Sequence, residues 1–85
     1  MAPQALTIGR LVTSGRGRDQ GQHYVVVGIL DRNHVLLSNG SSRRAGNPKK
    51  KNTKHLFAHA KLLEEVGDAV VRVTLARLGE GERQA

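Results

Sequence analysis

The fold of this chain is decided by residues 24–30, which read Tyr-Val-Val-Val-Gly-Ile-Leu. Five of these seven residues are β-branched or aromatic, the two kinds of side chain that are enriched in strands. The nearly continuous apolar character indicates a strand buried on much of both faces. Gly28 predicts a bulge or sharp bend, which small barrels use at their corners. We expect a core or core edge made of Tyr24, Val26, Ile29, Val35 and Leu37.

A glycine-rich, charged loop precedes this strand, after a short apolar pair at residues 11–12. Residues 14–21 read Ser-Gly-Arg-Gly-Arg-Asp-Gln-Gly. Glycines let backbone N–H groups approach phosphates, and arginines add charge and bidentate donors. No Gly-Lys-Ser/Thr follows, as a P-loop requires, and a strand rather than a helix comes next, which argues against a Rossmann motif. The alternative is an ordinary flexible hairpin loop.

Short strands and turns are expected after the central strand as well. Residues 31–33 predict a tight turn and residues 35–37 a strand. Asn39-Gly40 predicts a type I′ hairpin, which needs positive φ at both central residues. Residues 42–44 would return as a polar, basic strand that residues 45–48 break, followed by a basic loop at 49–54 and a closing strand at 55–57.

The pattern changes after Lys61. Apolar residues then recur at spacings of three and four, which indicates an amphipathic helix over 62–79 that ends at Gly79. Two alternatives stay open: a shorter helix with Asp68 as its N-cap, and a strand at 70–73. We therefore predict a mainly β protein, with a disordered start at 1–5, a small barrel at 6–61, a C-terminal helix at 62–79 and a tail at 80–85.

Charge is the most informative feature of the composition. The chain has 85 residues, enough for one domain, no cysteine and a net charge of +7. Residues 1–61 hold eleven basic and two acidic side chains, whereas residues 62–85 hold three basic and five acidic ones. This distribution indicates a polyanion bound to the body of the protein, with charge that merely aids solubility as the alternative. No membrane span or signal peptide is expected, and the compartment expected is the cytoplasm.

A second basic segment lies at 43–55. Residues 43–54 carry six basic side chains and no acidic one, and a phosphate backbone would relieve their repulsion. An asparagine there can hydrogen-bond base edges or the RNA 2′-hydroxyl, and His55 is an RNA contact or a packed strand residue. The alternative is a solvated loop. The predicted RNA contacts are Arg16, Arg18, Arg43, Arg44, Lys49, Lys50, Lys51, Asn52, Lys54 and His55, with Gly15, Gly17 and Gly21 permitting backbone approach or turns.

Enzyme and metal chemistry are poorly supported. Asp19 and Asp31 are the only acids in the body and sit in loop and turn contexts, so a hydrolytic triad is not expected. His55 and His59, four residues apart, lack an acidic or cysteine partner to complete a metal site. One Tyr and one Phe leave little for base stacking, which favours recognition of backbone and shape. We expect no enzyme activity, no cofactor, no metal and no small-molecule substrate.

These residues together resemble a known family. The pattern Ile8-Gly9-x-Leu11-Val12, Ser14, Arg18-Asp19-x-Gly21-x-x-Tyr24-Val25-Val26 is similar to a KOW motif. The continuation through residues 35–37, Arg43-Arg44, Asn47-Pro48-Lys49-Lys50-Lys51-Asn52 and Lys54-His55-Leu56 resembles small bacterial KOW-domain RNA-binding proteins. These are in turn similar to KOW-bearing large-subunit ribosomal proteins of archaea and eukaryotes. Tyr24 stands where many KOW motifs have a second glycine, which disfavours transcription-factor-like roles.

The resemblance covers about residues 8–57 and implies an SH3-like β-barrel of KOW type that binds RNA, typically ribosomal RNA, through its loops. It also implies association with the ribosome and with ribosomal proteins. Two other hypotheses remain. One is a protein-interaction adaptor that docks on the transcription or translation machinery, and the other is general DNA binding by charge.

Overall fold

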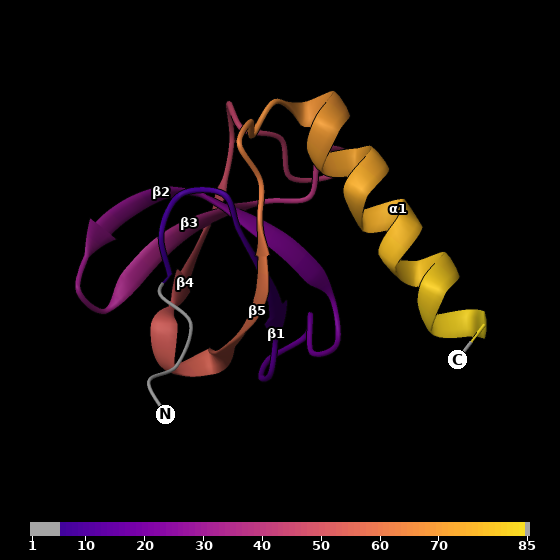
Figure 1. Ribbon diagram of the computed structural model, residues 1–85. Coiled ribbons are helices and arrows are strands. Elements are labelled where there is room, and N and C mark those ends of the chain that lie inside the picture. The colour runs from indigo at the N-terminus through magenta and orange to yellow at the C-terminus, as the bar shows by residue number, and fades with distance from the viewer. Residues whose placement is uncertain (1–5, 85) are drawn as a thin grey trace.

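The computed structural model describes residues 6–84, and their side chains as far as Leu78 (Figure 1). The disordered start predicted at 1–5 and the last residue of the predicted tail lie outside this range. The elements in chain order are β1 (Arg10–Ser14), β2 (His23–Asp31), β3 (His34–Ser38), β4 (Lys49–Asn52), the 3-10 turn η1 (Thr53–His55), β5 (Leu56–Leu62) and α1 (Asp68–Gln84). All five strands form one antiparallel sheet in the order β4-β3-β2-β1-β5. The mainly β prediction is confirmed.

The longest strand, β2, lies at the centre of the sheet. It pairs with β1 on one side and β3 on the other, and the register shifts between Val26 and Gly28. The bulge predicted at Gly28 is therefore confirmed. A bulge increases the local twist and bends the strand, which lets the sheet curl in Figure 1.

Alternation along the strands divides the core between the two faces of the sheet, since successive side chains point to opposite sides. The inner face holds a buried cluster, and the outer face packs against α1 through Leu11, Val25 and Val71. Of the five predicted core residues, Ile29 is the exception. It lies beyond the bulge, near the end of β2, and is 54 % exposed. The inner cluster is Val12, Tyr24, Val26, Val35 and Leu37.

The curled sheet stays open rather than closing into a barrel. β4 and β5 are its two edges, and no ladder joins them among residues 6–84. The turn η1 links these edges. Its Thr53 N–H donates to Asn33 O at 2.9 Å, and His55 O accepts from Gly15 N–H at 2.7 Å.

The expected hairpin at Asn39-Gly40 is wrong. No residue other than glycine has positive φ in the described chain, so Asn39 does not meet the type I′ requirement. Its side-chain Oδ1 instead accepts from the N–H groups of Ser41 and Arg43, at 3.0 and 2.9 Å. Such local side-chain bonds stabilise an Asx-type turn. Residues 42–44 are consequently loop, and the returning strand is β4, where a basic loop was expected.

The C-terminal helix is confirmed, but its predicted limits are wrong. It begins at Asp68, which is its first residue rather than the N-cap of the shorter alternative, and continues through Gly79 to Gln84. Leu63 is buried before the helix starts, so the apolar pattern from residue 62 onward partly reports a connecting segment packed on the sheet. The Asp68 carboxylate accepts from Ala45 N–H at 2.7 Å, which anchors the 39–48 loop. In the described part of the chain, no helix is long and apolar enough to cross a membrane.

Candidate nucleic-acid interface

A single buried carboxylate organises the loop between β1 and β2. Asp19 is only 8 % exposed. Its Oδ1 accepts from Ser14 Oγ at 2.9 Å, and its Oδ2 accepts from Tyr24 OH at 3.1 Å. Ser14 ends β1 and Tyr24 is near the start of β2, so the carboxylate ties the loop to both strands.

Two lysines of β4 complete the shell of Asp19. Lys51 Nζ lies 2.9 Å from Oδ1 and Lys49 Nζ lies 3.0 Å from Oδ2. Lys51 also donates to Arg16 O at 2.9 Å. Lys49 pairs with Leu37 and Lys51 with Val35, both inner-face residues, so the two lysines point to the inner side of the sheet. The resulting Asp19 cluster connects the edge strand β4 to the β1–β2 loop without a backbone ladder.

The Asp19 cluster shifts the pKa values of Asp19 and Tyr24 in opposite directions. Burial by itself would raise the pKa of Asp19, but hydrogen bonds from Lys51, Lys49, Ser14 and Tyr24 outweigh it and hold that pKa well below its usual range. Burial, and the adjacent Asp19 carboxylate, raise the pKa of Tyr24 to about 12. At neutral pH the site therefore holds an ionised Asp19 and a neutral Tyr24.

The three glycines of the loop have different structural roles. Gly17 and Gly21 adopt φ of +89° and +88°, a backbone conformation that residues with side chains resist. Gly15 has no positive φ. A Cβ there would lie 2.5 Å from Cε2 of Phe57, so this glycine permits close contact with a ring.

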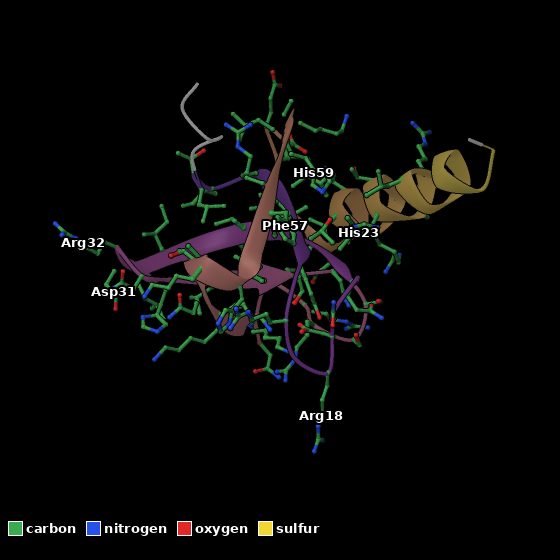
Figure 2. The ribbon with its side chains drawn as sticks, turned by 90° about the horizontal axis from the view of Figure 1, so that it is seen from below. Arg18, His23, Asp31, Arg32, Phe57 and His59 are labelled. Atoms are coloured by element: carbon green, nitrogen blue, oxygen red, sulfur yellow. The ribbon has the colours of Figure 1, made fainter. Side chains whose placement is uncertain are left out.

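The structure brings most of the predicted contact residues together. Arg16 and Arg18 are exposed on the loop, and Arg18 projects from its tip (Figure 2). Lys50 and Lys54 are exposed on the neighbouring β4 and η1. We give the name basic face to six cations on the β1–β2 loop, β4 and η1, of which Lys50 points to the opposite side of β4 from Lys49 and Lys51: Arg16, Arg18, Lys49, Lys50, Lys51 and Lys54.

Other predicted contacts have structural roles or lie in another loop. Asn52 accepts from Lys54 N–H at 2.9 Å and so caps η1. His55 is half-buried, and its carbonyl oxygen accepts a hydrogen bond from the Gly15 N–H. Arg43 and Arg44 are exposed in the 39–48 loop, where Ser38 Oγ donates to Arg43 O at 2.8 Å.

Sequence reasoning missed two features of this region. The sequence predicts Asp19 only as a loop acid, because its two lysine partners lie far along the chain, on β4. Phe57 was assigned to a closing strand, yet its side chain is 67 % exposed beside the loop. The apolar run Leu56-Phe57-Ala58 does not alternate with polar residues, so it does not indicate which of its side chains is exposed.

The described residues contain no group of three or more His, Cys, Asp or Glu arranged to hold a metal ion. The face instead offers ammonium and guanidinium groups, which bind anionic oxygens, whereas the N–H groups of Gly15 and Gly21 are bonded to His55 O and Ser14 O. No protein-family model matches the chain, and the search of curated proteins gives no match either.

Proposed function

We propose that this protein binds RNA by holding phosphates on the basic face, as the KOW resemblance implies. The observation that carries the proposal is the charge balance of that face. Two of its six cations, Lys49 and Lys51, hold the carboxylate of Asp19, which is buried and already paired. The remaining positive charge faces outward with nothing in the described chain to neutralise it.

Within this proposal the four outward-facing cations make the phosphate contacts. The engaged pair, Lys49 and Lys51, holds the loop in place and adds long-range positive potential. The curled five-stranded antiparallel sheet, whose edges β4 and β5 stay open, supports the barrel-like part of this proposal. Ribosomal RNA in the cytoplasm is the partner that the resemblance favours. The four cations proposed to contact phosphates are Arg16, Arg18, Lys50 and Lys54.

Salt dependence tests the proposal, because each phosphate contact releases counterions. Arg18→Ala should weaken RNA binding and reduce the log–log salt slope by about 0.7–0.9. Arg32→Ala removes the same charge from the turn between β2 and β3, far from Arg18 in Figure 2, and is the matched control. Equal effects of the two variants, or no RNA binding by the wild type at low salt, would contradict the proposal. Equal affinity for duplex DNA and structured RNA would favour general DNA binding.

A protein-interaction adaptor is the second candidate. Leu62, Val70 and Val73 are 52, 37 and 49 % exposed near the contact between α1 and the sheet, where an apolar partner would bind. An adaptor would show no RNA affinity that falls steeply with salt. Substituting Val70 and Val73 by serine should then abolish its partner binding and leave RNA binding unchanged.

A further inference from the structure

Phe57 is the most exposed of the large hydrophobic side chains that the structure describes, at 67 %. Its neighbours Leu56 and Ala58 pack against the inner core, so Phe57 points to the outer face of the sheet. The helix α1 covers that face at Leu11 and Val25 and leaves Phe57 uncovered. Exposure of the chain's only phenylalanine therefore follows from strand register.

The ring lies directly against Gly15, at the start of the β1–β2 loop that carries Arg16 and Arg18. Any side chain at Gly15 would collide with the ring, at 2.5 Å from Cε2 and 3.2 Å from Cδ2 and Cζ. Gly15 N–H also donates to His55 O, which holds the two segments together. The ring therefore lies at the point where the loop that carries Arg16 and Arg18 begins.

Two imidazoles share this outer face with Phe57. Phe57 pairs across the strands with Thr13, whose Oγ1 lies 2.6 Å from His59 Nε2 and 2.8 Å from His23 Nδ1. The two imidazole centroids are 6.2 Å apart with the rings at 72°. Figure 2 shows Phe57, His23 and His59 gathered on one side of the sheet. The hydroxyl of Thr13 has one proton, so it donates to at most one imidazole and accepts from the other. Both rings are therefore oriented by hydrogen bonds to the same hydroxyl.

We propose that Phe57 is a stacking platform for an unpaired RNA base, with His59 beside it and the adjoining phosphates held by Arg16 and Arg18. This inference rests on the proposed RNA-binding function and assigns it a class of target, single-stranded or looped RNA. Aromatic rings stack on bases of any sequence, and a nearby cationic segment holds the backbone.

The surroundings of Phe57 favour a nucleotide over a protein partner. An apolar docking surface would need further exposed apolar side chains around the ring. Here the neighbours are Thr13 and His59, which are polar, and Gly15, which directly precedes Arg16. They complement a base whose edges carry hydrogen-bonding groups and whose backbone is anionic.

A tryptophan at this position reports stacking directly, because the chain contains none. Phe57→Trp emission should be quenched when a short oligoadenylate binds. The matched control is Ile29→Trp, since Ile29 is 54 % exposed but lies near the turn between β2 and β3. Quenching at Ile29→Trp equal to that at Phe57→Trp would overturn the inference.

Affinity measurements separate this inference from the proposed function. Phe57→Leu should weaken oligoadenylate binding by roughly 5- to 150-fold with an unchanged salt slope, and leave binding to a fully paired RNA duplex unchanged. Wild-type affinity of Phe57→Leu for oligoadenylate would overturn the stacking role while RNA binding itself stands. Absence of any wild-type RNA binding would overturn both. If Phe57→Leu lost binding to an apolar protein partner but kept its RNA affinity, the stacking role would also be rejected.

Discussion

Replacing Asp19 by asparagine is expected to destabilise the protein strongly. The substitution keeps the shape of the side chain but removes the charge that pairs with Lys49 and Lys51. Removing one partner of a buried ion pair costs about 3–5 kcal/mol. Lys49, whose side chain is 29 % exposed, can turn toward water, whereas Lys51, at 11 %, stays largely enclosed. We therefore expect the low end of that range, about 3 kcal/mol of unfolding free energy.

Thermal unfolding followed by circular dichroism measures this effect. A loss of about 3 kcal/mol should lower Tm by roughly 12–24 °C in a domain of this size. Asp31→Asn is the control, because Asp31 is an exposed turn carboxylate and its removal should change Tm little. A Tm of Asp19→Asn as close to wild type as that of Asp31→Asn would refute the assignment of Asp19 as the anchor of the loop.

The pH dependence of the same difference has a definite sign. Because the pKa of Asp19 is lowered on folding, its contribution is fully present above the unfolded-state pKa of about 3.9. It is lost as pH falls below that value toward the lower pKa of the folded state. The difference in free energy between wild type and Asp19→Asn should therefore be constant from neutral pH to about pH 5 and shrink in stronger acid. A difference that grew with acidification would contradict the argument.

Three further predictions concern single positions. Gly21→Val should destabilise the fold by more than about 1 kcal/mol, because the φ of Gly21 is +88°. The control Gly46→Ala should leave the denaturant midpoint unchanged, because a Cβ at Gly46 meets no atom within 4 Å and its φ is not positive. Gly40→Ala should lower Tm, since its Cβ would collide with the backbone of the first turn of α1; an unaltered Tm would show that the helix shifts freely. Lys50→Ala should reduce the salt slope of RNA binding by about 0.7 and leave Tm constant, whereas Lys51→Ala should lower Tm. If Lys51→Ala instead reduced the salt slope and left Tm constant, Lys51 would be a solvated phosphate contact.

The sequence by itself determined the local features that depend on neighbouring residues. Residues 24–30 identified the central strand, because β-branched side chains favour the extended backbone whatever surrounds them. Gly28 indicated the bulge, and the spacing of apolar residues indicated the final helix. The sign of the charge also followed from composition, since it needs no geometry.

Only the tertiary structure decided how the basic residues are used. Lys49, Lys50 and Lys51 are identical in sequence terms, yet alternation along β4 turns two toward Asp19 and leaves one exposed. Asp19 lies thirty and thirty-two residues from its lysine partners, so no local pattern encodes the pairing. Phe57 is exposed because β5 is an edge strand and α1 packs elsewhere on the outer face. Burial and pairing depend on which distant segments meet, and that is settled by packing of the whole chain rather than by the order of neighbouring residues.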